Sequence, residues 1–249
     1  MNSDSHQTEY YNVFWHDTDQ NGQMSFAAIS RYLQETAWRH ADRLGFGYNH
    51  AREVNQFWVL LRQRIVMDVF PKWNDQISIE TWPRGTDGFW AFRDYLIRNE
   101  RERSLVRVTS SWMLIDMDTH RPQKPDLVQH AMMKTDLQLA LENNADKVLF
   151  EKEGIIAEHR TVKATEIDLN SHVTNAKYAD WIADTLASVY PERKFFNYHI
   201  NFLTEAIQTD EVVISYYENE ELIKIKACRK SDQKNLFIAR TQLNFLNPK

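Results

Sequence analysis

The sequence predicts an α+β fold that occurs twice in tandem, with each copy an antiparallel sheet wrapped around one long helix. Three observations lead to this prediction. Two segments have helical periodicity, most of the remaining chain has the composition of β-strands, and a short polar motif precedes each helix. A single helix followed by consecutive strands favours a sheet packed against that helix. We therefore expect two domains, residues 1–130 and 131–249.

The two helices are predicted from apolar residues that recur three or four positions apart. The first spans residues 25–44 and the second spans residues 175–190. Each segment has an apolar stripe with polar residues on the other side, which is typical of an amphipathic helix. The stripes are Ile29, Leu33, Ala37 and Ala41 in the first segment, and Tyr178, Ile182, Leu186 and Val189 in the second. Ser25 and Thr174 precede these stripes and are expected to be the N-cap residues.

Strands are predicted where β-branched and aromatic residues dominate. The candidates are residues 57–70, 76–84, 89–98 and 105–116 in the first half, and residues 156–165, 197–204, 211–217, 222–229 and 236–245 in the second. Thr86-Asp87-Gly88 is a turn signal between two of them. Residues 118–146 contain Arg-Pro, Lys-Pro and a polar helix-like piece, and we expect them to connect the two domains.

The two halves resemble each other in two places. DQNGQMS at residues 19–25 precedes the first helix, and DLNSHVT at residues 168–174 precedes the second. Further along, DQISI at residues 75–79 pairs with DEVVI at residues 210–214. Short Asp-x-Asn matches also arise by chance. Two matches in the same order, each followed by similar elements, favour a duplication.

The composition excludes several classes of protein. The net charge of −5 lacks the basic excess of a nucleic-acid-binding protein. No run of about 18 or more apolar residues is present, so we expect no membrane span. The N-terminal residues MNSDSHQTEY lack the apolar segment of a secretory signal. Cys228 is the only cysteine, which excludes an internal disulfide and a cysteine-based metal site. We expect a soluble cytoplasmic protein with no cofactor and no metal.

The polar motif of the second half resembles the signature of a known family. DLNSHVTNAKYADWI at residues 168–182 is similar to the D-x-N-x-H-V-x-N-x-x-Y-x-x-W signature of acyl-acyl-carrier-protein (acyl-ACP) thioesterases of plants and bacteria. WHDTDQNGQMS and RYLQETAWRHADRLGF, at residues 15–25 and 31–46, resemble their N-terminal domain. The first string also resembles the D-x-D-x-x-G motif of simpler hotdog thioesterases. The resemblance spans nearly the whole chain and implies a double hotdog fold.

The resemblance implies that the chain hydrolyses acyl-ACP thioesters, with the acyl carrier protein as its partner. Carried onto this sequence, the catalytic set of the family is Asp168, Asn170, His172 and Glu205. Plant members have a cysteine directly after the glutamate, whereas this chain has Ala206. A thiol nucleophile is therefore excluded at that position, and a carboxylate-based mechanism is implied.

Thioester hydrolysis requires an activated water or nucleophile and a stabilised oxyanion. The leaving thiol has a pKa near 8.5, so it departs with little help from an acid. Asp168 and Glu205 are both candidates for the base or the nucleophile, and the sequence does not separate them. His172 is suited to orient the water or polarise the carbonyl, and Asn170 to hold a neighbouring group. The start of the helix near residues 173–175, including Val173 and Thr174, offers backbone N–H groups to the oxyanion.

Each of these residues also has an ordinary structural interpretation. Asp168 and Asn170 are typical of turns and helix caps, and Glu205 of a solvated strand end. The first copy has Gln23 in place of His172 and a position near Phe70 in place of Glu205, so it lacks the titratable pair. We therefore expect the first copy to seat the acyl chain instead. Its candidate lining residues are Trp38, Phe46, Phe57, Trp58 and Leu60.

Three alternatives remain open. An acyl-CoA thioesterase of the hotdog superfamily would use the same residues, and the sequence does not firmly separate the two substrates. A hydroxyacyl dehydratase would need a Gly- and Pro-rich run after the histidine, which is absent here. A non-catalytic acyl-thioester-binding module would not need Asp168, His172 and Glu205 together.

A tandem pair of hotdog domains supplies the domain pairing that single hotdogs obtain by dimerising. The sequence is therefore compatible with both a monomer and a homodimer.

Overall fold

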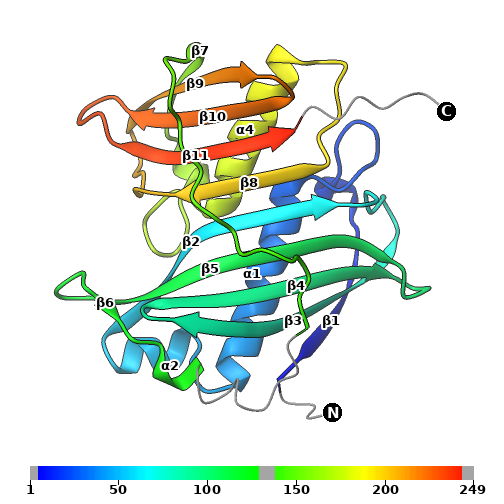
Figure 1. The fold of residues 1–249 in the computed structure, drawn as a ribbon, viewed down its shortest axis with the longest axis vertical. Helices are drawn as coiled ribbons and strands as arrows, with labels where there is room; N and C mark the ends of the chain where they lie inside the picture. Colours follow the sequence, from blue (N-terminus) through cyan, green and yellow to red (C-terminus); the bar gives the residue numbers. More distant parts are fainter. Residues whose placement is uncertain (1–4, 129–137, 243–249) are drawn as a thin grey trace. The chain divides into compact units, whose positions relative to one another are not determined.

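The fold is described from a computed structural model, which covers residues 5–128 and 138–242. The chain forms two compact units, Met1–Asp146 and Lys147–Lys249. In each unit, one long helix accompanies an antiparallel sheet (Figure 1). The predicted α+β class is therefore confirmed.

The first unit contains one sheet whose strand order is β1-β3-β4-β5-β2, with β6 paired to β5. All of these pairs are antiparallel. Helix α1 lies behind this sheet in Figure 1 and crosses its strands. The elements in chain order are β1 (Gln7–Asn12), a short 3-10 turn (Trp15–Asp17), α1 (Phe26–Arg43), α2 (Tyr48–Glu53), β2 (Gln56–Met67), β3 (Gln76–Asp87), β4 (Trp90–Asn99), β5 (Ser104–Asp116) and β6 (Pro122–Gln123).

The second unit repeats this plan with the strand order β8-β11-β10-β9-β7, again antiparallel throughout. Its elements are β7 (Ile155–Thr161), a 3-10 turn (Ala164–Glu166), α4 (Asn175–Val189), β8 (Asn197–Phe202), β9 (Glu211–Asn219), β10 (Leu222–Arg229) and β11 (Asn235–Gln242). Residues 243–245 of the last predicted strand lie outside the described residues.

Both predicted helices are confirmed, but their caps differ. The hydroxyl of Ser25 accepts a hydrogen bond from the N–H of Ala28 at 3.1 Å, as expected of an N-cap. Thr174 occupies the N-cap position of α4, but in the described structure its side chain makes no capping hydrogen bond. The elements that were not predicted are short. Strand β1 (QTEYYN) has no aliphatic residue, α2 is too short to show a helical period, and β6 has two residues.

The core of each unit forms where the strands turn apolar side chains toward their helix. Ile29 and Leu33 of α1, and Ile79 of β3, are fully buried in the first unit. In the second unit, Ile225 and Phe237 are fully buried on neighbouring strands. Burying one such side chain stabilises the fold by about 1.5–3 kcal/mol. None of the helices in the two described ranges is long and apolar enough to cross a membrane.

The boundary between the units lies later in the chain than the sequence predicted. The N–H of Ala140 donates to the buried carboxylate of Asp94 at 2.9 Å. The Trp82 indole donates to the carbonyl of Gln138 at 2.9 Å. These bonds fix residues 138–146 to the first sheet, so the boundary expected at residue 130 moves to residue 146. Residues 129–137, which contain the expected boundary, are not described.

Candidate active site

The polar motif of the second unit forms a tight loop between the 3-10 turn and α4. The N–H of Asp168 donates to the carbonyl of His172 at 2.9 Å, and the N–H of Ser171 donates to the carbonyl of Asp168 at 3.0 Å. The Asp168 carboxylate accepts the N–H of Asn170 at 2.8 Å. Ser171 adopts the left-handed region, with φ of 68°. The Asp-x-Asn spacing therefore builds a turn that ends at His172.

This loop brings His172 to Glu205, which lies far away in the sequence. The Nε2 atom of His172 is 3.0 Å from Oε2 of Glu205. The N–H of Val173 donates to the carbonyl of Ala206 at 2.8 Å, which ties the loop to the turn that carries Glu205. The side chains of His172 and Glu205 are 34% and 55% exposed. The pair therefore forms within the second unit, and both of its side chains reach the surface.

The two other predicted site residues have a structural role that is visible in the same loop. The Asp168 carboxylate makes the turn described above, and Asn170 supplies the backbone N–H that it accepts. Both residues share the loop with His172. The hydrogen bonds that the described structure gives to the Asp168 side chain stay within the turn, rather than reaching His172 or Glu205.

The buried carboxylate of Glu166 lies just before the loop and bonds to the elements around it. Glu166 accepts hydrogen bonds from Trp181 at 2.9 Å, from Arg160 at 3.1 Å and from the N–H of Lys163 at 2.8 Å. Its backbone carbonyl accepts the N–H of Thr174 at 3.0 Å. The Arg160 guanidinium lies 4.2 Å from the centre of the Trp181 ring, a cation–π geometry. The network joins both ends of the loop to α4, and sequence reasoning missed it.

The same hydrogen bonds correct one expectation about the oxyanion. Val173 and Thr174 were expected to offer backbone N–H groups at the start of α4. The N–H of Val173 is used by the carbonyl of Ala206, and that of Thr174 by the carbonyl of Glu166. These two hydrogen bonds hold the loop in place, because their acceptors belong to the turn after β8 and to the 3-10 turn before the loop. Of the N–H groups expected at residues 173–175, the one that these two bonds do not use is that of Asn175.

The first unit contains a second copy of this loop. The N–H of Asp19 donates to the carbonyl of Gln23 at 2.8 Å, and the Asp19 carboxylate accepts the N–H of Asn21 at 2.8 Å. Gly22 has φ of 68°, the same value as Ser171. The N–H of Met24 donates to the carbonyl of Pro71 at 2.8 Å, as Val173 does to Ala206. The aligned hydrogen bonds show that the loops are equivalent.

The equivalence identifies what the first copy lacks. Because Pro71 aligns with Ala206, the preceding residue Phe70 aligns with Glu205. Gln23 aligns with His172 in the same way. The first unit thus retains the turn but has Gln23 and Phe70, and no imidazole–carboxylate pair, at these two positions. The Asp-x-Asn turn thus occurs in both units, whereas the His172–Glu205 pair occurs at these positions only in the second unit.

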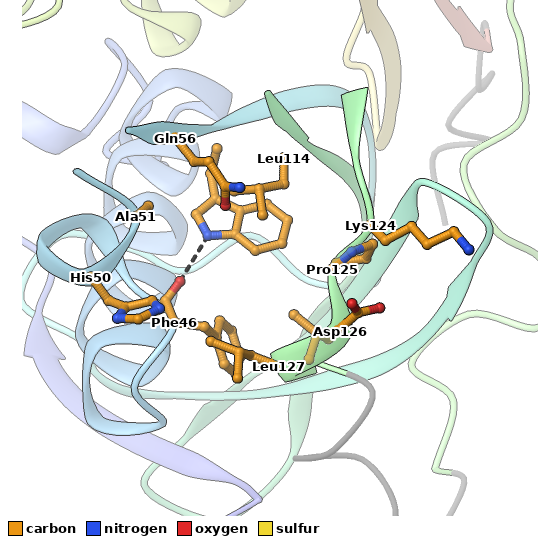
Figure 2. Close-up of a pocket in the computed structure, with 11 residues that line it drawn as sticks. Phe46, His50, Ala51, Gln56, Leu114, Lys124, Pro125, Asp126 and Leu127 are labelled. Carbon is orange, nitrogen blue, oxygen red and sulfur yellow. Dashed lines mark hydrogen bonds between the residues drawn. The ribbon is translucent and has the colours of Figure 1, made fainter. Parts of the chain in front are cut away.

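A separate pocket lies within the first unit, with a volume of about 190 Å³ (Figure 2). Its apolar wall is formed by Phe46, Ala51, Trp58, Leu114, Pro125, Leu127 and Val128, and its polar rim by His50, Gln56, Lys124 and Asp126. The Trp58 indole donates to the carbonyl of Phe46 at 2.8 Å, which joins β2 to the segment after α1. Phe46 and Trp58 were predicted as lining residues.

The remaining predicted lining residues do not line this pocket. Trp38 is 42% exposed on α1, whereas Leu60 is buried and Phe57 is half-buried on β2. Sequence reasoning missed Leu114 and Val128. They come from β5 and from the residues after β6, so only the fold brings them together. Among residues 5–128 and 138–242, no cluster of three or more His, Cys, Asp or Glu side chains could hold a metal ion.

Comparisons with known proteins agree across the two units. Residues 4–130 match the acyl-ACP thioesterase N-terminal domain, and residues 151–244 match the acyl-ACP thioesterase C-terminal domain. A chloroplastic palmitoyl-acyl carrier protein thioesterase of Gossypium hirsutum is 32% identical over 177 residues, which cover 65% of this chain and 42% of the relative. A chloroplastic oleoyl-acyl carrier protein thioesterase of Coriandrum sativum is 27% identical over 208 residues, covering 75% and 55%. The chain spans about half the length of the curated relatives it matches.

Solved structures show the same fold. An acyl-ACP thioesterase from Bacteroides thetaiotaomicron superposes with a TM-score of 0.84 at 19% identity, over 96% of this chain and 98% of that one. A 12:0-ACP thioesterase from Umbellularia californica gives a TM-score of 0.82 at 20% identity, over 96% and 97%. Each of these proteins aligns with nearly the whole chain, so the double hotdog fold implied by the sequence motif is confirmed.

Proposed function

The chain belongs to the acyl-ACP thioesterase family, and from this premise we propose that it hydrolyses acyl-ACP thioesters to a free fatty acid and the thiol of the carrier protein. The observation that supports this most directly is the contact of His172 with Glu205, at 3.0 Å, on the motif loop of the second unit. Both side chains are partly exposed, and the equivalent loop of the first unit lacks both. The pair is thus not explained by the folding of the loop.

The proposed reaction begins with a water molecule held by the His172–Glu205 pair. The pair takes a proton from the water as its oxygen bonds to the thioester carbonyl carbon. The carbonyl oxygen becomes an oxyanion, and its collapse breaks the C–S bond. The thiol leaves as a thiolate with a pKa near 8.5 and regains a proton from the pair or from solvent. The products are one carboxylic acid and one thiol.

The start of α4 is suited to stabilise the oxyanion. The first helical residues have no intrahelical partner for their N–H groups, and the helix dipole is positive there. Since the N–H groups of Val173 and Thr174 hold the loop closed, we assign this role to Asn175 and Ala176. Asp168 and Asn170 complete the proposed site, with Asp168 as a second carboxylate whose position is fixed by its turn.

Activity is proposed to require no thiol. Cys228 is half-buried on β10, and burial raises the pKa of its thiol, which disfavours the reactive thiolate. We expect Cys228→Ser to change kcat by less than about twofold. Iodoacetamide treatment of the unmodified protein should likewise leave the rate of thioester hydrolysis nearly intact. Complete loss of activity on alkylation, with no loss in Cys228→Ser, would show that modification blocks the site sterically. Loss in both would contradict the carboxylate mechanism.

The first unit is proposed to select the acyl chain, with the pocket around Phe46 and Trp58 as its seat. Each buried methylene contributes about 0.8 kcal/mol, roughly a fourfold change in affinity. Enlarging the pocket with Trp58→Ala should move the preferred substrate to chains longer by about two to four carbons. Filling it with Val128→Phe should move the preference in the opposite direction. The measurement is kcat/KM over a series of acyl-ACP substrates of increasing length.

A matched control for these variants is Phe89→Ala, because Phe89 is a 44% exposed aromatic residue of the same unit outside the pocket. Its chain-length profile should equal that of the unmodified protein. An unchanged profile in both pocket variants, with normal folding, would place the acyl chain elsewhere.

The decisive test of the function is thiol release from matched acyl-ACP and acyl-CoA substrates. We expect a higher kcat/KM for acyl-ACP. A preference for acyl-CoA would favour the acyl-CoA thioesterase alternative. Saturable binding of an acyl-thioester without release of thiol would favour a non-catalytic binding module. A metal-free buffer and no added cofactor are sufficient for this assay.

A further inference from the structure

Arg229, at the end of β10, contacts the turn that carries Glu205. Its Nη1 atom donates to the backbone carbonyl of Glu205 at 3.2 Å and to the carboxylate of Asp210 at 3.2 Å. We propose that Arg229 is a positioning residue, which holds the Glu205 peptide so that the Glu205 carboxylate stays within reach of His172. This inference rests on the proposed function for the role of the pair, but its geometry can be tested without it.

The Arg229 side chain is itself held rigidly. Its Nε and Nη2 atoms donate to the two carboxylate oxygens of Asp232 at 2.9 Å and 2.8 Å, a bidentate pair. The side chains of Arg229 and Asp210 are only 16% and 14% exposed. A planar guanidinium fixed by one carboxylate presents its remaining N–H groups in a set direction. Because its guanidinium is held by Asp232, Arg229 can keep the carbonyl of Glu205 in one position. A freely rotating side chain could not do so.

The turn does not need Arg229 in order to form. In the second unit, the Asp210 carboxylate accepts the N–H of Ile207 at 3.0 Å. In the first unit, Asp75 accepts the N–H of Lys72 at 2.8 Å in the same way. The backbone turn is thus closed by an aspartate in both copies. Arg229 adds a hydrogen bond to Glu205, whose equivalent in the first copy is Phe70.

The first copy has Asn99 at the position of Arg229. Asn99 pairs with Ile77 in the sheet, as Arg229 pairs with Val212, and both begin the turn to the next strand. The N–H of Asn99 donates to the backbone carbonyl of Arg103 at 3.1 Å. The N–H of Arg229 likewise donates to the backbone carbonyl of Lys234 at 2.9 Å. The Asn99 side chain folds back onto its own turn, where it accepts two backbone N–H groups at 3.0 Å.

The arginine therefore occurs in the copy that has Glu205 and not in the copy that has Phe70. Glu205 is 55% exposed, so few side-chain contacts restrict it. A misplacement of about 1 Å can cost about 10²-fold in rate, since catalytic groups must be held near their productive geometry. Fixing the peptide from which the carboxylate extends is a direct way to limit that movement.

The test compares Arg229→Asn, which installs the residue of the first copy, with Arg229→Lys. We expect Arg229→Asn to lower kcat by about 10- to 100-fold while KM changes by less than about twofold. Arg229→Lys should recover part of kcat because one N–H donor and the charge remain. The control is Arg107→Asn, which removes another bidentate arginine–aspartate pair, with Asp68 at 2.8 Å, in the first unit. Its kcat should stay near that of the unmodified protein.

A crystal structure of Arg229→Asn provides a readout that does not depend on activity. We expect the His172–Glu205 distance to rise from 3.0 Å to beyond hydrogen-bond range, about 3.5 Å. A retained contact together with normal kcat would overturn the proposal. If Arg229→Asn does not fold, Asp232→Asn removes one charge that orients Arg229 and is expected to lower kcat by a smaller factor with the same KM. If the unmodified protein releases no thiol, the proposed function fails, while the crystallographic distance still decides whether Arg229 positions Glu205.

Discussion

Replacing His172 with alanine is expected to lower kcat for acyl-ACP hydrolysis by about 10²–10⁴-fold, the usual effect of removing a positioned general base. The imidazole is in contact with Glu205 at 3.0 Å, so its loss removes one half of the pair that we propose takes the proton from water. Glu205→Ala is expected to have an effect of similar size. Because the two side chains act as a unit, the double variant should be little slower than either single variant. The measurement is single-substrate kinetics with one acyl-ACP at saturating concentration.

The first unit supplies the control for this experiment. Gln23→Ala truncates the residue that aligns with His172, in a loop with the same hydrogen bonds. We expect it to retain kcat within about twofold, because that loop lacks the carboxylate partner. If Gln23→Ala stopped hydrolysis as completely as His172→Ala in equally folded protein, the assignment of chemistry to the second unit would be wrong.

Replacing Asp168 with asparagine is expected to lower kcat by about 10²–10⁴-fold as well. Asparagine retains a carbonyl oxygen that can accept the N–H of Asn170, so the turn should survive. What the variant removes is the negative charge. Asp168→Ala, by contrast, removes both the charge and the turn. A loss of equal size in both variants would show that the carboxylate, and not the turn, is what catalysis requires.

The equivalent substitution in the first loop is Asp19→Asn, since Asp19 accepts the N–H of Asn21 at the same distance of 2.8 Å. It should leave kcat nearly unchanged and should shift Tm by less than about 4 °C. Near-normal turnover in Asp168→Asn would assign Asp168 to the turn alone. The catalytic set would then reduce to His172, Glu205 and the backbone amides at the start of α4.

The two units differ at the positions that carry the proposed chemistry. Both units keep the aspartate turn and the backbone bond that joins it to the turn after β2 or β8. The second unit alone adds His172, Glu205 and Arg229. The first unit has Gln23, Phe70 and Asn99 at these positions and contains the apolar pocket. In the second unit, His172 contacts Glu205 and Arg229 donates to the carbonyl of Glu205, so the three residues lie together.

The sequence by itself determined the fold class, both long helices, the larger strands and the motif of the candidate site. It could do so because apolar periodicity, strand composition and turn residues are local signals. The Asp-x-Asn-x-His spacing in particular was sufficient to predict a loop before α4. The end of the first unit at Asp146, the partners of the Val173 and Thr174 amides and the full lining of the pocket were not determined in this way.

The tertiary structure decided which residues meet. The contact of His172 with Glu205 depends on the hydrogen bond from Val173 to Ala206. The hydrogen bond from Arg229 to the carbonyl of Glu205 depends on the register of β10 beside β9. The first unit extends to Asp146 because Asp94, on β4, accepts the N–H of Ala140 from the segment that was expected to connect the domains. Such contacts join residues far apart in the chain, and their free energy depends on geometry that only the folded sheet supplies. A local pattern can place a residue in an element, but it carries no information about the partner that the element will face.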